Sequence, residues 1–346
     1  CVLEDKVKSM NFVKIDKLNI EKFIQEHVIL LFEVRKSRLK SLQLAIMEAY
    51  CLLKKFNPIV IKNPPLSDVK GIFALAFHKI DIQTLREKFD KLGYSFKVLL
   101  VSFCNKEVAD NKLDFDSLYS WKGKTFQVSI VFEQDVNWFL AEAPDRREFA
   151  ILDTEGKIKK LMGYRGNGKD LGRRALPVED CRMMVNLAML EKNDVLLDPF
   201  AGGGGIIYQA YKTTMKIISN DIDPILKPGL EMYGAKHYIG KASDLVLDEP
   251  VNALVTEVPF FDNSTNIVIQ SIIYLAQFLT DNAKIIIMTS NNQKEEIKRE
   301  LSKVYFYCFG FDINRKGTLV SLLYFTKSKR IESELSGLYF NIKDMF

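Results

Sequence analysis

The most informative segment of the chain reads Val195-Leu196-Leu197-Asp198-Pro199-Phe200-Ala201-Gly202-Gly203-Gly204-Gly205-Ile206-Ile207. An apolar run ends in an acid, a cluster of glycines follows, and apolar residues resume directly after the glycines. Glycine lets a backbone take positive φ angles and approach a ligand closely. We therefore expect a buried strand that leads through a ligand-binding turn into a helix.

The residues around this segment alternate between strand-like and helix-like patterns. A helix is expected over 177–190, with a proline near its first turn. Short apolar runs predict successive strands that end near Asp198, Asp221 and Glu257. Such alternation predicts a doubly wound parallel sheet that binds ligands at the carboxyl ends of its strands. Further strands are expected over 284–289, 306–311 and 319–325, the last two as a hairpin-like pair.

The part of the chain before residue 160 mixes short strands and helices. Strand-like and helix-like segments alternate over 27–34, 41–56, 71–78, 81–92 and 97–103. This order predicts a compact α+β arrangement of the ferredoxin-like type, with further strands over 125–132 and 149–153. A basic, glycine-rich stretch follows. We therefore expect an N-terminal region over 1–160, a linker over 161–175 and a second domain over 176–346.

Glycine turns occur in several nucleotide-binding sites, and two of these sites fit the chain poorly. A dinucleotide site needs GxGxxG directly after the strand, but Ile207 stands at the third glycine position and Asp198 would repel a pyrophosphate. A P-loop needs Lys and then Ser or Thr after the glycines, where Ile206 stands instead. The segment 163–169 comes nearer to the P-loop motif, but Asp170 follows its lysine.

A third interpretation is a site for S-adenosylmethionine, which carries a cationic sulfonium and a free amino group. Asp198 at the first strand end complements these charges, and the glycines let the methionine part lie against the turn. Asp221 at the next strand end is placed to accept the ribose hydroxyls, and Asp244 to meet the adenine amine. A single such acid is usually a loop or cap residue, whereas three at successive strand ends are more specific. The expected cofactor-binding residues are Asp198, Pro199, Phe200, Gly202, Gly204, Asp221 and Asp244.

Two further segments carry a family resemblance. One is Val255-Thr256-Glu257-Val258-Pro259-Phe260, at the position of the motif Asp/Asn-Pro-Pro-Tyr/Phe in methyltransferases that modify exocyclic amines. The other is the helix Leu176-Pro177-Val178-Glu179-Asp180-Cys181-Arg182-Met183-Met184-Val185-Asn186-Leu187-Ala188. Over about residues 160–330 the chain resembles class I methyltransferases, in particular the archaeal and eukaryotic tRNA guanine methyltransferases. This resemblance implies an α/β, Rossmann-like seven-stranded sheet preceded by a ferredoxin-like and THUMP-like RNA-binding region.

The resemblance also implies how the fourth-strand motif acts on a guanine amine, whose lone pair is delocalised into the ring. Glu257 is expected to accept a hydrogen bond from the amine, Pro259 to fix the loop and Phe260 to stack on the base, so that catalysis comes mainly from orientation. The base must be unpaired or flipped out to reach this pocket. Glu257 stands where the family has Asp or Asn, and Val258 replaces the first proline. We therefore expect a reshaped pocket and a looser loop.

The formal net charge of +5 lies entirely within residues 1–160. Basic residues gather at 35–40 and again in a junction cluster near residue 160. Such clusters are most often solvated faces, but Lys and Arg also neutralise the phosphates of nucleic acids. The junction cluster expected to hold RNA comprises Lys157, Lys159, Lys160, Arg165, Lys169, Arg173 and Arg174.

Composition and cysteine spacing exclude several classes of protein. The chain is 47% hydrophobic and 27% charged, which excludes global disorder. Its five cysteines form no CxxC pair and it has three histidines, so we expect no metal site and a reducing compartment. No apolar run approaches the roughly 18 residues of a membrane span, and no early segment has a signal-peptide pattern. We expect a cytoplasmic protein that does not engage a membrane.

Together these features predict a methyltransferase that uses S-adenosylmethionine to modify the exocyclic N2 amine of a guanosine in tRNA. Two alternatives stay open, namely a non-catalytic RNA-binding member of the family and an amino-methyltransferase that acts on DNA or another substrate. A small helper or activator protein is also compatible with the sequence. The modified position, the number of methyl groups and the natural start of a chain that begins with Cys1 stay open as well.

Overall fold

The computed structural model describes residues 11–104, 118–134, 150–152, 158–161, 176–213, 216–261, 263–315 and 318–345. This description leaves out the side chains of residues 150–152, 158–161 and 225. The chain divides into two compact units, which are Cys1–Asp135 with Gly337–Phe346, and Val136–Ser336. The predicted linker lies outside the described residues from 162 to 175, so the predicted domain boundaries remain predictions.

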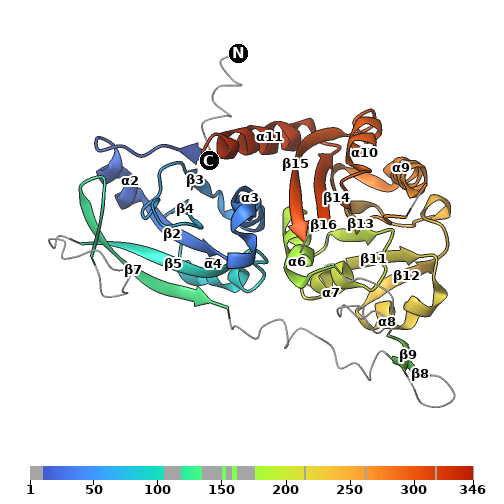
Figure 1. Ribbon diagram of the computed structural model, residues 1–346. Helices are drawn as coiled ribbons and strands as arrows, with labels where there is room; N and C mark the ends of the chain where they lie inside the picture. Colours follow the sequence, from blue (N-terminus) through green and yellow to red (C-terminus); the bar gives the residue numbers. More distant parts are fainter. Residues whose placement is uncertain are drawn as a thin grey trace. The chain divides into compact units, whose positions relative to one another are not determined.

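The first unit is built on one seven-stranded sheet, coloured blue to green in Figure 1. Its strands lie in the order β1-β3-β4-β2-β5-β7-β6. Their bounds are β1 (Phe12–Val13), β2 (His27–Val34), β3 (Ile59–Ile61), β4 (Ile72–His78), β5 (Ser95–Cys104), β6 (Tyr119–Trp121) and β7 (Lys124–Glu133). The helices are α2 (Ile20–Glu26), α3 (Leu42–Leu52) and α4 (Ile82–Phe89), with short 3-10 turns η1 (Lys36–Ser41) and η2 (Lys54–Phe56).

Six of these elements form the β-α-β-β-α-β arrangement of ferredoxin-like folds. In chain order they are β2, α3, β3, β4, α4 and β5, and β2 lies between β4 and β5 with both neighbours antiparallel. β3 pairs antiparallel with the outer side of β4. The ferredoxin-like α+β region predicted from the sequence is therefore confirmed. Sequence patterns missed β3 because it is only three residues long. A THUMP-like character remains a prediction.

Both faces of the first sheet are buried. Neighbouring residues of a strand point to opposite sides, so a run of adjacent buried residues covers both faces. Leu31 and Ala74 belong to a buried cluster on one face. Phe32 and Phe73 point to the other face, where their rings stack at 5.0 Å and Phe32 meets Phe89 of α4 at 6.1 Å. This double burial explains why β2 and β4 are apolar runs without polar alternation.

The second unit contains the glycine-rich segment. Its strands are β8 (Ala150–Leu152), β9 (Ile158–Leu161), β10 (Val195–Asp198), β11 (Lys216–Asp221), β12 (Ala235–Ile239), β13 (Val251–Glu257), β14 (Leu279–Ser290), β15 (Phe306–Arg315) and β16 (Thr318–Thr326). Its helices are α6 (Val178–Leu187), α7 (Gly205–Tyr211), α8 (Lys227–Met232), α9 (Ser264–Leu275) and α10 (Lys294–Leu301), and α11 (Lys329–Lys343) follows β16. Short turns are η3 (Pro224–Leu226), η4 (Ala242–Asp244) and η5 (Ala276–Phe278). Among the described residues, no helix combines the length and hydropathy needed to cross a membrane.

The main sheet of this unit has the strand order β12-β11-β10-β13-β14-β16-β15. The pairs from β12 to β14 are parallel, and β16 is antiparallel to both β14 and β15. The predicted Rossmann-like seven-stranded sheet with a hairpin-like final pair is confirmed. The strand order reverses between β10 and β13, which makes the carboxyl ends of these strands the expected ligand-binding edge.

Sequence patterns did not predict α8 or β12. α8 is six residues long and contains Pro228 and Gly229, which are poor helix formers. β12 is the edge strand of the sheet, and only Ala235 and His237 in it are buried. Both elements are too short and too polar for hydrophobic periodicity to reveal them.

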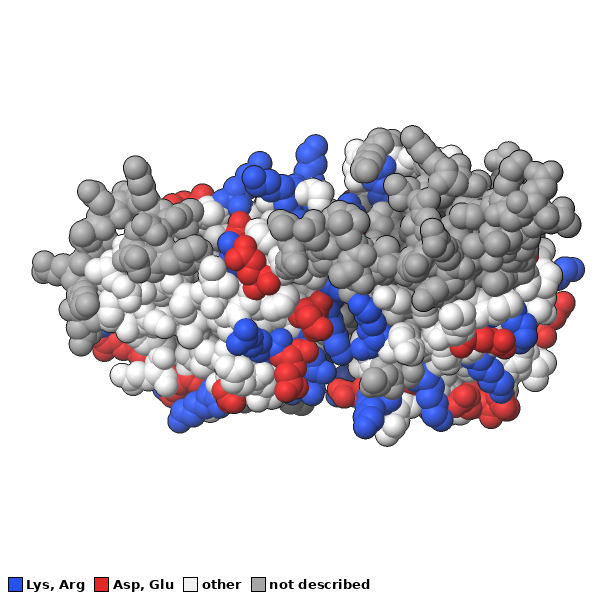
Figure 2. Space-filling model, turned by 90° about the horizontal axis from the view of Figure 1, so that it is seen from below, with Lys and Arg blue, Asp and Glu red and all other residues white. Residues whose placement is uncertain are grey.

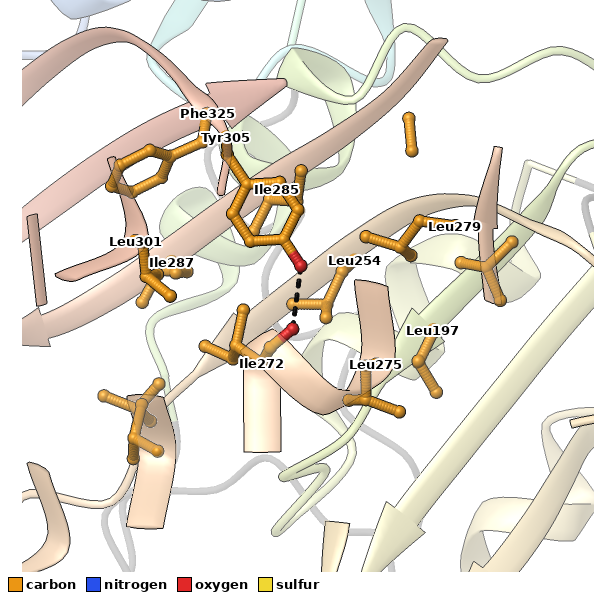
Figure 3. Packing of buried hydrophobic residues seen from close by; sticks show 14 of the residues in the cluster. Leu197, Leu254, Ile272, Leu275, Leu279, Ile285, Ile287, Leu301, Tyr305 and Phe325 are labelled. Atoms are coloured by element: carbon orange, nitrogen blue, oxygen red, sulfur yellow. Dashed lines mark hydrogen bonds between the residues drawn. The ribbon is translucent and has the colours of Figure 1, made fainter. Parts of the chain in front are cut away.

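Helices α9 and α10 cover one face of this sheet with a continuous apolar core, shown in Figure 3. Strand residues such as Leu197, Leu254 and Ile285 pack there against Ile272 of α9 and Leu301 of α10. Each such side chain contributes roughly 1.5–3 kcal/mol when it is fully buried. The hydroxyl of Tyr305 donates to the carbonyl oxygen of Ile272 at 2.8 Å, which joins the segment between α10 and β15 to α9.

Helix α6 covers the opposite face of the sheet. Tyr324 lies between Leu323 and Phe325, which both belong to the core under α9 and α10, so its ring points the other way. Its hydroxyl donates to the carbonyl oxygen of Leu187 in α6 at 3.2 Å. Helices therefore protect both faces of the strands and leave the ends of the strands to form the site.

Candidate site at the carboxyl edge of the second sheet

The carboxyl ends of the parallel strands gather charged residues at one edge of the sheet. Asp198 ends β10, Asp221 ends β11 and Glu257 ends β13. β15 is antiparallel to β16, which is itself antiparallel to β14, so the last residue of β15, Arg315, reaches the same edge. Sequence patterns predicted the acids at this edge but not the arginine.

Asp198 is a buried carboxyl group, 2% exposed. Its Oδ1 accepts hydrogen bonds from the hydroxyl of Thr256 on β13 at 2.7 Å and from the backbone N–H of Phe200 at 3.2 Å. Burial raises the pKa of Asp198 to about 7, the two hydrogen bonds oppose this rise, and the carboxylates of Asp221 and Glu257 add to it. Asp198 therefore changes its charge near neutral pH.

Asp221 organises the glycine turn that follows β10. Its Oδ2 accepts from the backbone N–H of Gly202 at 2.8 Å, and its Oδ1 accepts from that of Asp223 at 3.0 Å. Gly202 and Gly204 have φ angles of +49° and +78°, which side chains disfavour, so the turn depends on glycine at both positions. The acid predicted to face a ribose thus also holds the loop that would face the rest of the ligand.

Asn220 is a site residue that sequence reasoning missed. It is 2% exposed, and its Nδ2 donates to the carbonyl oxygens of Pro199 and Gly240, both at 3.1 Å. The backbone carbonyl oxygen of Asn220 accepts from the backbone N–H of Ala201 at 2.9 Å. One side chain therefore joins the loops after β10 and β12. The available signal was an amide directly before the strand-end acid of an apolar strand.

The remaining predicted cofactor residues lie around this turn. Phe200 is half-buried and packs against the core under α9 and α10. Asp244 lies exposed in η4, where its Oδ1 accepts from the hydroxyl of Ser243 at 2.9 Å. No hydrogen bond among the described residues joins Asp244 to Asp198 or Asp221, so its predicted contact with an adenine amine stays a prediction.

Glu257 takes part in a three-residue charge network. Its Oε1 accepts from Arg315 Nη1 at 2.7 Å, and Arg315 Nε donates to Asp180 Oδ2 at 2.9 Å. Burial raises the pKa of Glu257, the Arg315 guanidinium opposes this rise, and the Asp180 carboxylate adds to it. The other two members of this network, Arg315 on β15 and Asp180 on α6, could not be inferred from spacing along the chain.

Val258, which replaces the first proline of the family motif, does not loosen the loop. Its backbone N–H donates to the carbonyl oxygen of Met288 on β14 at 2.9 Å, and its side chain is 2% exposed within the core. A proline could not donate this hydrogen bond. The expectation of a looser loop is therefore wrong, because Val258 extends the pairing of β13 with β14 by one residue.

Gln293 fixes the rest of this loop and was also missed from the sequence. Its Nε2 donates to the carbonyl oxygen of Pro259 at 3.1 Å and to Ser264 Oγ at 2.9 Å. Its Oε1 accepts from the hydroxyls of Thr289 at 3.1 Å and Ser290 at 2.8 Å. Pro259 is thus held through its carbonyl group as well as by its ring. Beyond it, Phe260 and Phe261 are 42% and 61% exposed and offer aromatic surface at the site.

Restoring the family proline with Val258→Pro is expected to lower the free energy of unfolding by about 1–3 kcal/mol, because the buried Met288 carbonyl loses its partner. Denaturant unfolding of both proteins measures the difference. Val258→Ala is the control, since Pro keeps more apolar volume than Ala. If packing alone mattered, Val258→Pro would be the milder change, and that result would contradict this role of the N–H group.

The predicted RNA contacts are described only in small part. Lys159 and Lys160 lie in β9, where only the backbone is described, and Lys157, Arg165, Lys169, Arg173 and Arg174 lie outside the described residues. In the first basic cluster, Arg35 Nε donates to the Gly93 carbonyl oxygen at 2.8 Å, and Arg38 is buried with its guanidinium 5.1 Å from the centre of the Tyr94 ring. Two of its cations thus serve the fold. On the face seen in Figure 2, basic and acidic side chains are interspersed over the described surface of each unit.

The charges around Asp198 suit a cationic ligand. The carboxylates of Asp221 and Glu257 both raise the pKa of Asp198, so negative charge gathers around this carboxyl group. A positive group beside Asp198 would oppose this rise and favour the ionised form of Asp198. A Cβ atom built on Gly202 would meet nothing nearer than the Phe200 carbonyl oxygen at 3.9 Å, so the backbone angle, and not crowding, is what requires glycine there.

Known proteins similar to this chain include tRNA-modifying enzymes, although no family model matches it. Two curated relatives are named tRNA (guanine(10)-N2)-dimethyltransferase. The one from Methanothermobacter thermautotrophicus is 38% identical over 86 residues, which is 23% of this chain and 26% of the relative. The one from Pyrococcus abyssi is 32% identical over 125 residues, which is 32% of this chain and 37% of the relative. The predicted resemblance is confirmed over these residues, which span about a quarter to just over a third of the relatives.

Solved structures of methyltransferases are also similar to the chain. TrmN from Thermus thermophilus has a TM-score of 0.47 at 11% identity and covers 86% of this chain and 99% of its own. An rRNA methylase from Streptococcus thermophilus has a TM-score of 0.35 at 13% identity and covers 40% of this chain and 90% of its own. At these levels of similarity, the fold assignment depends on the strand order itself.

Proposed function

We propose that this chain transfers a methyl group from S-adenosylmethionine to the exocyclic N2 amine of a guanosine in tRNA. The observation that carries the proposal is that one sheet edge holds an acidic, glycine-lined turn next to a carboxylate beside an exposed aromatic loop. Asp198 and Asp221 belong to the turn, and Glu257 and Phe260 to the second part. Relatives named for guanine-N2 methylation support the choice of amine and of RNA.

The cofactor supplies an electrophilic methyl group. Asp198 complements its positive charge at the end of β10. Asp221 accepts from the ribose hydroxyls while it keeps its bonds to Gly202 and Asp223, because each carboxylate oxygen has a second lone pair. Asp244 meets the adenine amine from the loop after β12. Pro199, Phe200, Gly202 and Gly204 shape the turn against which the methionine part lies.

The target base enters beside β13, which is the fourth strand of the main sheet in chain order. Glu257 accepts a hydrogen bond from the guanine amine, and Phe260 stacks on the base, so that the amine points along the line of methyl transfer. Pro259 acts through its position, since Gln293 holds its carbonyl group. Because these groups orient the amine without forming a bond to it, most of the rate gain comes from alignment of two bound reactants.

The tRNA partner is part of this proposal, and the junction cluster is proposed to contact its phosphates. The ion pair with Arg315 engages one oxygen of Glu257, and the non-catalytic alternative requires that the other oxygen also fails to accept from a substrate. An amino-methyltransferase for DNA would differ only in the nucleic acid it accepts. Methylation of tRNA by the chain alone would show that no helper protein is required.

The test is to incubate the full chain alone with unmodified tRNA and methyl-labelled cofactor, and then to identify modified nucleosides by mass spectrometry. N2-methylated guanosine is the expected product. A tRNA that carries inosine at the labelled position lacks only the N2 amine and should receive no methyl group. The absence of product across a complete tRNA pool, together with measurable cofactor binding, would favour the non-catalytic alternative. Labelling of DNA but not of tRNA would favour the alternative of an amino-methyltransferase that acts on DNA.

A further inference from the structure

We propose that Arg315 is a positioning residue which, anchored on Asp180, holds Oε1 of Glu257 and leaves Oε2 as the acceptor for the substrate amine. This inference deepens the proposed function and rests on it. It concerns the place where the chain departs from its family, because the longer Glu257 stands where Asp or Asn is expected. The arginine and the longer acid together replace the short side chain.

The geometry orders the three residues from the interior to the surface. Asp180 is fully buried, the Arg315 side chain is 15% exposed and the Glu257 side chain is 24% exposed. Arg315 Nε lies 2.9 Å from Asp180 Oδ2, and its Nη1 lies 2.7 Å from Glu257 Oε1. Asp180 therefore fixes the guanidinium from below, and the guanidinium fixes the carboxylate that reaches furthest toward solvent.

The network is not arranged for stability alone. Arg315 Nη2 is buried and has no hydrogen-bond partner among the described residues. A buried donor without a partner lowers stability, and such local costs are typical of functional sites. The guanidinium is oriented by its two carboxylate partners at the expense of its remaining donor. The arrangement therefore orients the Glu257 carboxylate while one buried N–H group of the arginine makes no hydrogen bond within the part of the chain that the structure describes.

The charge of Arg315 also favours the ionised form of Glu257. Burial raises the pKa of Glu257, and Asp180 adds to the rise, while Arg315 opposes it. Among the described residues, the Asp198 carboxyl on β10 and the Cys181 thiol on α6 are further ionisable groups that face this network. Without the guanidinium, Glu257 would more readily take up a proton, and one of its oxygens would then donate where it should accept.

The length of Glu257 yields the sharpest expectation. If only the family residue mattered, Glu257→Asp would preserve or improve activity. If Arg315 positions the carboxylate, the shorter Asp cannot reach both the guanidinium and the substrate, and activity falls. The two views therefore predict opposite outcomes for one substitution that adds no new chemical group.

The experiment measures kcat and KM for tRNA methylation by the full chain across pH 5 to 9. The variants are Glu257→Asp, Arg315→Lys and Arg315→Met, with Arg299→Met as a matched control, since Arg299 is exposed and pairs only with Glu300 in the described structure. We expect kcat to fall at least about tenfold in Glu257→Asp and Arg315→Met, with an unchanged KM for the cofactor. The acid limb of the pH profile should move to higher pH in Arg315→Met and return toward the original position in Arg315→Lys. Arg299→Met should match the parent.

Two further arms keep the test decisive. Arg315→Met removes a cation from the buried Asp180, which destabilises proteins strongly, so Asp180→Asn/Arg315→Met is the folded substitute if the single variant unfolds. If the parent methylates no RNA, the proposed function fails. Carboxyl ¹³C NMR titration of Glu257 in the parent and the double variant then still tests the network, and the midpoint should rise in the variant. An unchanged midpoint, an unchanged acid limb, or a fully active Glu257→Asp would overturn the inference.

Discussion

Asp198→Asn is expected to weaken cofactor binding about 100-fold and, at the same time, to stabilise the ligand-free protein at neutral pH. Burial raises the pKa of Asp198 from its ordinary 3.8 to about 7. The folded chain therefore holds a proton that the unfolded chain releases between about pH 4 and pH 7. The contribution of this group to the free energy of unfolding falls as the pH rises through that window, by about 4 kcal/mol in total. Asn has no charge to bury and avoids this loss.

Denaturant unfolding of both proteins from pH 4 to pH 8 measures this effect as a difference. The variant should gain stability over the parent as pH rises to about 7, and the gain should then level off. Binding of a cation lowers the pKa of Asp198, so the parent should bind the cofactor more tightly as pH rises to the same point. Loss of a hydrogen bond to a charged group, worth about 1.5–3 kcal/mol, sets the size of the affinity change. Parallel stability curves with equal affinity would refute the placement of Asp198.

Asp221→Ala is expected to reduce cofactor affinity about 100-fold or more. The carboxylate of Asp221 is proposed to accept two ribose hydroxyls, and hydrogen bonds to a charged group contribute about 1.5–3 kcal/mol each. The same substitution releases the backbone N–H groups of Gly202 and Asp223, so the glycine turn loses the side chain that shapes it. Direct and indirect losses act in the same direction, because both remove contacts on the same ligand.

Calorimetric titration of the cofactor into each protein provides the measurement. Asp248→Asn is the matched control, since Asp248 is exposed, pairs with Lys236 and precedes the first residue of β13 rather than following its last. Asp221→Asn separates the two effects, because its amide oxygen can still accept from one backbone N–H group. Affinity should decrease from parent to Asn to Ala. Equal affinity in the parent and Asp221→Ala would mean that the ligand binds elsewhere.

The fold was predictable where hydrophobic patterns are long and regular. The run from Val195 into the glycine turn identified β10 and α7, and the final hairpin followed from two apolar runs. β3 and β12 escaped because they are short. In the edge strand β12 the buried and exposed positions alternate, but one of the buried residues is the polar His237. A search for alternating hydrophobic residues therefore does not detect this strand. Tertiary pairing, and not local preference, makes these segments strands.

The site was predictable where its residues stand at the ends of predicted strands. Asp198, Asp221 and Glu257 could be located in this way. Arg315 could not, because its partners Asp180 and Glu257 are 135 and 58 residues away along the chain. The compensation for the lost proline was hidden for the same reason, since the Val258 N–H group donates to Met288 on another strand. Spacing along the chain locates the side chains that face a ligand, whereas the contacts that hold them come from the packed sheet.

The amide of Asn220 has a consequence for the spacing of the loops at this edge of the sheet. It joins the Pro199 carbonyl after β10 to the Gly240 carbonyl after β12, and β11 lies between these strands. Because one nitrogen lies 3.1 Å from both oxygens, the two carbonyl oxygens stand no more than about 6.2 Å apart. Widening this gap would break two hydrogen bonds of a buried side chain. Asn220 therefore holds the loops after β10 and β12 together across the end of β11, closer than two strand spacings of about 4.8 Å would place them.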